Sequence, residues 1–301
     1  MNQHHLGPRD YASALCVILI WGTNFVAMKI ALAEMSPFQL GAGRYLFAVL
    51  PLVAFVKPPK LHAKWLLLYG LCQGVGQFGL LFLSLRIGMS ASLASVLLQT
   101  QLFFTALFGY FLLGEPVSRT LKGAMLLAAI GLACFAMNYA GSGPAGGTTL
   151  AGFMLCLGAA AMWAASNIVV RRAQRDSPGF DVLGFMVWSS LVPIVPFFLL
   201  SELFDHPIGH SLHLSWSALG ALAYLGWFAT IAAYALWTGL LKRHPANKVA
   251  PFSLGVPLVG IGAGMAALGD TITQWQWIGI AFVLAAMALA IGVKSVIRAR
   301  V

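Results

Sequence analysis

The segment from Tyr11 to Ala33, YASALCVILIWGTNFVAMKIALA, decides the fold of this chain. Residues Tyr11 to Met28 carry no charge, and as a helix they extend about 27 Å, close to the thickness of the hydrocarbon core of a bilayer. In lipid, the backbone N–H and C=O groups of such a run must be satisfied within the segment. The segment therefore predicts a helix that spans a membrane.

The middle of this helix is polar, with Trp21, Gly22, Thr23 and Asn24 in sequence. Polar side chains at that depth are costly in lipid, so we expect them to face protein or a water-filled cavity. Further along the chain, Trp163-Ala-Ala-Ser-Asn167 stands in the middle of another apolar run. A basic residue follows each tryptophan by eight positions, as Lys29 and Arg171. The chain thus reads as two copies of one membrane unit.

Composition agrees with a membrane protein. The 301 residues are 60% hydrophobic and 9% charged, whereas soluble domains carry about 25% charged residues. The net charge of +10 comes from basic residues at helix ends, as expected if Lys and Arg concentrate on the cytoplasmic side. We therefore expect a lipid bilayer as partner and no nucleic acid.

The apolar runs predict an all-α protein of ten transmembrane helices. The expected spans are 11–33, 38–56, 65–86, 90–113, 120–139, 149–170, 180–204, 215–241, 246–268 and 275–296. All but three of the 18 Lys and Arg residues then fall on the side of both termini. The exceptions are Lys29, Arg44 and Arg86. Both termini are therefore expected to be cytoplasmic.

The two halves of the chain resemble each other. Leu113-Gly-Glu115 ends the fourth span and Leu268-Gly-Asp270 ends the ninth. Because five spans is an odd number, the second copy must be inserted upside down. We expect a first five-helix repeat at 1–140, a flexible linker at 141–149 and an inverted repeat at 150–301. Inverted repeats are typical of transporters with a site near the midplane.

These motifs resemble the ten-helix drug/metabolite transporters, the EamA-type exporters. The resemblance rests on Trp21-Gly-Thr-Asn24, on Arg44, on the LGE and LGD ends, and on the segment ANKVAP at 246–251. Within that family the chain resembles inner-membrane exporters of amino acids, notably the aromatic amino-acid exporter branch. The resemblance implies a central cavity formed by the first, third, fourth, sixth, eighth and ninth helices, with the fifth and tenth at the periphery.

Polar and aromatic side chains in the middle of the spans are the candidate substrate-binding residues. Where one span contains several of these residues, they lie on the same helix face at 100° per residue. Packing between helices is the alternative interpretation of the same residues. The candidates are Trp21, Asn24, Gln73, Gln77, Gln101, Trp163, Asn167 and an aromatic stripe formed by Tyr224, Trp227 and Tyr234.

Pro257 is a candidate gating residue, since it deprives the carbonyl of Ser253 of its helical partner. The resulting kink would serve gating or would fit the helix to its neighbours. We expect a structural role for Arg44. Glu115 with Ser118, and Asp270 with Thr273, are expected to cap the helices that follow them.

All eight acids and all seven histidines fall outside the middle of the spans. The sequence also lacks a metal-ligand cluster, a phosphate loop and a nucleophile–base pair, so we expect no catalytic residues, no metal and no cofactor. The predicted function is export of amino acids or similar zwitterions by alternating access, without proton coupling.

In this interpretation amides and hydroxyls bind both substrate charges, and the functional unit is a monomer. A multidrug or hydrophobic cation exporter is the alternative. A scaffold without transport is a further one, and it predicts that a tryptophan filling the cavity has no effect.

Overall fold

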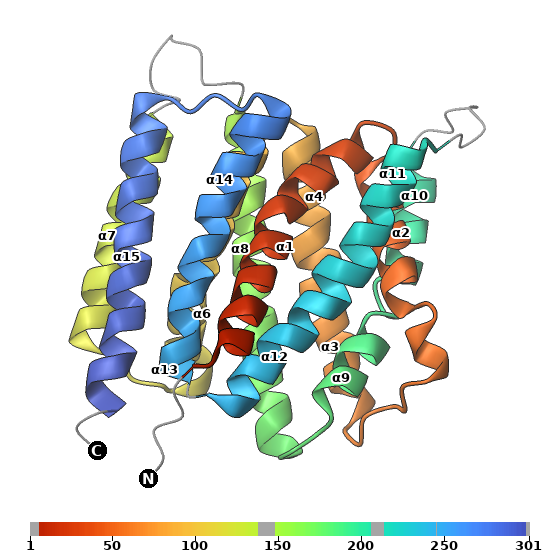
Figure 1. Ribbon diagram of the computed structural model, residues 1–301, viewed down its shortest axis with the longest axis horizontal. Coiled ribbons are helices and arrows are strands. Elements are labelled where there is room, and N and C mark those ends of the chain that lie inside the picture. Colours follow the sequence, from red (N-terminus) through yellow and green to blue (C-terminus); the bar gives the residue numbers. More distant parts are fainter. Residues whose placement is uncertain (1–5, 138–147, 206–213, 245, 299–301) are drawn as a thin grey trace.

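The computed structural model describes residues 6–137, 148–205, 214–244 and 246–298, and the regular elements in these ranges are helices (Figure 1). The first half contains α1 (Pro8–Leu32), α2 (Pro37–Val49), η1 (Leu52–Ala54), α3 (Ala63–Tyr69), η2 (Gly70–Phe78), α4 (Gly79–Arg86), α5 (Ala91–Leu97), η3 (Leu98–Thr100), α6 (Gln101–Leu113) and α7 (Arg119–Met137). The second half contains α8 (Leu150–Asp176), α9 (Val182–Ser189), α10 (Ile194–Phe204), α11 (Trp216–Ala223), η4 (Tyr224–Ala232), α12 (Ala233–Arg243), α13 (Ala246–Val249), η5 (Ala250–Leu254), α14 (Gly255–Leu268) and α15 (Gln274–Arg298).

Within the described residues, nine helices are long and apolar enough to cross a membrane. They are Pro8–Leu32, Ala63–Arg86, Ala91–Leu113, Arg119–Met137, Leu150–Asp176, Val182–Phe204, Trp216–Leu240, Pro251–Leu268 and Gln274–Ile291. The chain is a multi-pass membrane protein. The start of α1 and the end of α15 lie at the same end of the bundle (Figure 1).

The segment that departs from the expected spans is 38–56. Its helix, α2, has 13 residues and ends at Val49. Leu50 adopts an extended conformation, as is usual for a residue that precedes a proline, and Pro51 lacks the N–H needed to continue the helix. A short 3₁₀ turn, η1, follows.

Two nine-residue π-helices, η2 and η4, interrupt the spans at 63–86 and 216–240. Similarly, the 3₁₀ segments η3 and η5 precede α6 and α14. Gly114 and Gly269 then end α6 and α14 in the same left-handed conformation, each with φ of 66°. π-Helices are rare and often mark functional sites, and here they occur at corresponding places in the two halves.

Helices α7 and α15 pack side by side at one edge of the molecule (Figure 1). Gly131 and Gly279 meet at this interface. A Cβ on either one would lie 2.9 Å from the carbonyl oxygen of the other. Small residues let helix backbones approach closely in membranes, so this pair sets the distance between α7 and α15.

The hydroxyl groups cap the following helices, but the acids do not. Ser118 Oγ accepts from Leu121 N at the start of α7, and Thr273 Oγ1 accepts from Gln276 N in α15. The expectation that Glu115 and Asp270 cap these same helices is wrong, because both carboxylates bind elsewhere. Glu115 binds arginines of α8, and Asp270 accepts from Ser92 N at the start of α5.

The expected linker at 141–149 lies mostly outside the described residues. Thr149 is described and caps α8, where its hydroxyl accepts from Gly152 N at 3.0 Å. The same hydroxyl donates to Ile87 O at 2.8 Å. The start of α8 is therefore attached to the end of α4.

Candidate functional site

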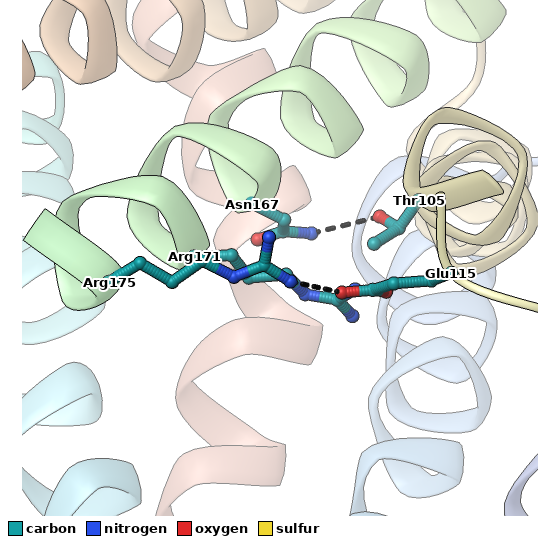
Figure 2. A network of polar contacts seen from close by, with 5 residues as sticks. All are labelled: Thr105, Glu115, Asn167, Arg171 and Arg175. Carbon is teal, nitrogen blue, oxygen red and sulfur yellow. Dashed lines mark hydrogen bonds and ion pairs between the residues drawn. The ribbon is translucent and has the colours of Figure 1, made fainter. Parts of the chain in front are cut away.

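A cavity of about 300 Å³ lies between α6 and α8, and we call it the α6–α8 cavity. Gln101, Thr105, Asn167 and Arg171 provide its polar lining. Asn167 Nδ2 donates to Gln101 Oε1 at 2.9 Å and to Thr105 Oγ1 at 3.1 Å. Figure 2 shows Asn167 reaching from α8 toward Thr105 on α6. Two of the candidate residues, Gln101 and Asn167, thus come together on a wall that can both donate and accept hydrogen bonds.

An ion-pair cluster lies one helical turn from Asn167 (Figure 2). Arg171 Nη1 is 2.5 Å from Glu115 Oε2, and Arg175 Nη2 is 3.2 Å from Glu115 Oε1. Arg172 donates to Leu112 O at 3.0 Å. Cations favour the C-terminal end of a helix because of its exposed carbonyls and its dipole. The arginines of α8 therefore hold the end of α6.

A second, smaller cavity of about 20 Å³ is lined by Arg44 and is called the Arg44 cavity. That volume suffices for about one water molecule. Tyr69, Gln73, Ser189, Thr230 and Tyr234 are among its other lining residues. They come from α3, η2, α9, η4 and α12. Two candidate residues, Gln73 and Tyr234, therefore face this cavity.

A hydrogen bond links the walls of the two cavities. Ser166 Oγ donates to Gln73 Oε1 at 2.5 Å, and both residues are buried. Gln73 lines the Arg44 cavity, whereas Ser166 directly precedes Asn167 of the α6–α8 cavity. Nearby on η2, Gln77 is 2% exposed, and its Oε1 has no hydrogen-bond partner within the described part of the chain.

Candidate residues of α1 contact this region as well. Trp21 donates from Nε1 to Ala229 O at 3.0 Å, and its ring meets Tyr234 edge-on with centroids 5.1 Å apart. Asn24 Oδ1 accepts from Arg44 Nη1 at 3.3 Å. The polar centre of α1 thus faces protein, where it contacts η4, α12 and the guanidinium of Arg44.

The aromatic residues of η4 and α12 do not form one wall. Tyr224 donates from its hydroxyl to Ile20 O at 2.9 Å, which joins η4 to α1. Trp227 is 45% exposed and donates to Leu50 O at 3.1 Å. The π-helical register of η4 explains this separation, because 100° per residue does not describe a helix with i→i+5 hydrogen bonds.

Trp163 of α8 is half-buried and packs against the main hydrophobic core.

Pro257 lies in the first turn of α14 rather than inside a continuous helix. Its carbonyl accepts from Ser95 Oγ at 3.4 Å. The carbonyl of Ser253, expected to lose its helical partner, accepts from Gln99 Nε2 at 3.3 Å. Side chains of α5 and η3 therefore supply donors to the backbone at the junction of η5 and α14.

The sequence analysis did not identify four of the residues that line these cavities. Thr105, Ser189, Thr230 and Tyr69 belong to none of the motifs used there. Arg44 could be recognised from the sequence, because it is a basic residue inside an expected span. Its burial to 2% exposure places it in the interior rather than at a helix end.

These features define a multi-pass helical membrane protein with polar cavities between its spans. The sequence matches the EamA-like transporter family twice, over residues 10–137 and 150–292. The chain belongs to the EamA-like transporter family, and it is a transporter rather than an enzyme.

Known proteins similar to this chain include two with informative names. A probable amino-acid metabolite efflux pump of Salmonella typhimurium is 38% identical over 94% of each chain. A protein of the same description from Escherichia coli is 37% identical over 93% of each chain. A crystal structure with 18% sequence identity has a TM-score of 0.60 over 94% of this chain and 96% of that one, which shows a shared fold.

Proposed function

We propose that this protein exports amino acids or similar small zwitterionic metabolites across an inner membrane by alternating access. The observation that carries the proposal is the α6–α8 cavity, where Gln101, Thr105 and Asn167 interact around about 300 Å³. That volume is at the lower end of the range for small-molecule sites, about 300–1,000 Å³. Amides can donate to a carboxylate and accept from an ammonium group. The names of the two efflux pumps support the same substrate class.

The proposed architecture has ten spans in two inverted repeats, 1–140 and 150–301, with α2 as the second span and both termini in the cytoplasm. The corresponding pairs η2 with η4, and η3 with η5, support the repeat. Two matches to one family do so as well. Two similar halves of opposite orientation can rock to expose a central site to either side.

The remaining candidates are proposed to line or support the substrate path, with Pro257 as a gating residue. They are Trp21, Asn24, Gln73, Gln77, Trp163, Tyr224, Trp227 and Tyr234.

Export of hydrophobic cations is the less favoured function. An arginine lines each of the two cavities, and in the part of the chain that the structure describes no carboxylate lines either one. In the Arg44 cavity a cation would therefore meet like charge without an ion-pair partner, whereas the charge of Arg171 is already paired with Glu115.

Counterflow of labelled L-phenylalanine into liposomes that hold the purified full-length protein tests the function. Unlabelled amino acids should compete, and tetraphenylphosphonium should not. Gln101→Leu should raise the half-saturation concentration several-fold, because one hydrogen bond is worth about 0.5–1.5 kcal/mol. Gln274→Leu, at the exposed start of α15, is the matched control and should transport normally. Competition by the hydrophobic cation alone would favour the alternative function.

Cysteine labelling tests the orientation. In a background without the four native cysteines, cysteines at Ser142 and Gly209 should react with an impermeant reagent from outside intact cells, whereas one at Lys60 should be protected. Positions 142 and 209 lie outside the described residues, so their accessibility is predicted from the sequence alone. Reaction at position 60 from outside would contradict the orientation.

A further inference from the structure

Arg44 is a buried positive charge with only neutral partners. Its side chain is 2% exposed, and a charge inside a membrane protein is costly unless it is paired. Nε donates to Thr230 Oγ1 at 3.2 Å, and Nη1 donates to Asn24 Oδ1 at 3.3 Å. The guanidinium carbon lies 3.9 Å from the centre of the Phe78 ring. None of these groups carries a negative charge.

The acids of the chain are engaged elsewhere. Among the residues that the structure describes, no carboxylate forms an ion pair with Arg44. Glu202 is exposed on α10. The other seven have partners: Asp10 with Arg243, Glu34 with Ser215, Glu115 with Arg171, Asp176 with Lys64, Asp181 with Gly184, Asp205 with Ser201, and Asp270 with Ser92.

The guanidinium is also incompletely bonded. Hydrogen bonds from a charged donor are usually about 2.7–2.9 Å long, so both bonds of Arg44 are long. Nη2 has no hydrogen-bond partner in the described ranges. Since Arg44 lines the small cavity, part of its planar donor fork remains available there. This fork matches the two oxygens of a carboxylate.

The rest of the cavity wall suits an anion. The hydroxyls of Tyr69, Ser189 and Tyr234 belong to lining residues, and hydroxyl groups can donate. Tyr69 has a thioether, the sulfur of Met186 at 3.6 Å, as its hydrogen-bond partner, and a thioether is a weak acceptor. Ser189 Oγ already donates to Met186 O at 3.2 Å, so it is the Tyr69 hydroxyl for which a carboxylate would be a stronger acceptor than the group now present.

We propose that Arg44 binds the carboxylate of the transported zwitterion. This inference rests on the proposed function, and it identifies the substrate group that the protein recognises. In the described conformation the cavity, at about 20 Å³, holds no more than about one water molecule. Binding therefore requires the wall formed by η2 and α9 to separate. Gly70 and Gly74 of η2 pack closely on Val192 and Pro193 in the turn after α9, and in this proposal the wall separates at that contact.

The test compares three ligands that differ at the carboxylate. Counterflow of labelled L-phenylalanine is measured in liposomes with L-phenylalanine, L-phenylalaninamide or phenethylamine as competitor. The wild type should favour L-phenylalanine over the other two by at least about tenfold, since charge-assisted hydrogen bonds are stronger than neutral ones. Arg44→Gln should raise the half-maximal concentration of L-phenylalanine and reduce the tenfold preference to about one.

Two further variants separate recognition from folding. Arg44→Lys keeps the charge but loses the planar fork, so its preference should fall between those of the wild type and Arg44→Gln. Arg86→Gln is the matched control. Arg86 lies at the end of α4 and donates to Leu32 O at the end of α1, so this variant should leave the preference unchanged. A structural role for Arg44 would lower flux without changing the preference, and that result would overturn the proposal. If the wild type transported no amino acid at all, the proposed function would fail together with this inference.

Discussion

Glu115 and Arg171 form an ion pair of 2.5 Å that joins the end of α6 to α8. The corresponding residues of the other half, Asp270 and Lys29, do not form one in the described structure. Lys29 Nζ donates to Leu85 O at 2.6 Å, and Asp270 accepts from Ser92 N at 2.8 Å. The two halves thus contain equivalent charges, but the ion pair is closed in only one of them.

Glu115→Gln should loosen the end of α6 and open the α6–α8 cavity. The two side chains are 39% and 37% exposed, so the pair contributes of the order of 1 kcal/mol or less, which corresponds to a shift of up to about fivefold in an equilibrium. In the cysteine-free background, a cysteine at Thr105 should react several-fold faster with an impermeant thiol reagent. The matched control is Asp176→Asn, which removes the exposed pair with Lys64. Equal rates in all three proteins would show that the ion pair does not restrict the cavity.

Gln77→Leu should stabilise the protein and impair transport. The buried Oε1 has no partner in the described part of the chain, and an unsatisfied buried polar group costs about 1–3 kcal/mol. Removing it should raise the melting temperature of the detergent-purified protein, whereas L-phenylalanine flux should fall. Lower stability with normal flux would mean that Gln77 serves helix packing.

Thr105→Trp should block transport because the indole fills the α6–α8 cavity. Thr120→Trp, at the exposed start of α7, controls for the general effect of a large side chain. Surface expression and melting temperature establish that both variants fold. Undiminished flux through Thr105→Trp would place the substrate path elsewhere, or would favour a scaffold without transport.

Glu34 links the α1–α2 connection to α11. Ser215 donates to its carboxylate from Oγ at 2.5 Å and from the backbone N–H at 2.8 Å, and these bonds lower the pKa of Glu34 below its ordinary value of 4.5. A lowered pKa stabilises the folded state above the ordinary value, and the effect is lost as pH falls through the lowered one. The difference in melting temperature between wild type and Glu34→Gln should therefore be larger at pH 7 than at pH 3.5. A difference independent of pH would exclude the carboxylate as its cause.

The sequence predicts the spans well because length and apolar composition alone decide what can cross lipid. It also singles out Gln101 and Asn167 as candidates, since both are amides in the middle of apolar runs, but their contact is known only from the structure. The sequence does not predict the π-helical register of η2 and η4, because this register depends on how the two segments pack against other helices. Gly74 against Pro193, and Gly226 against Phe47, are examples of such packing.

The same limit applies to the charges. Glu115 precedes a helix start, which is the usual place for a capping acid, and the arginines that bind it instead are 56 and 60 residues away in sequence. For Arg44 the sequence gives the charge and its depth, but the absence of an acid partner in the described structure follows only from the placement of all eight carboxylates.

Transport should not be driven by protons. A proton-coupled antiporter needs a group with a pKa near working pH that is exposed alternately to each side, usually a carboxylate or a histidine. Within the described residues neither type lines the α6–α8 cavity or the Arg44 cavity. An arginine keeps its proton at any relevant pH, and a zwitterionic substrate has a net charge near zero from about pH 5 to 8. In liposomes with equal L-phenylalanine on both sides, an imposed pH gradient should therefore cause no accumulation. Accumulation that a protonophore abolishes would contradict this and would identify Glu34, Glu115 and Asp270 as the carboxylates to test next.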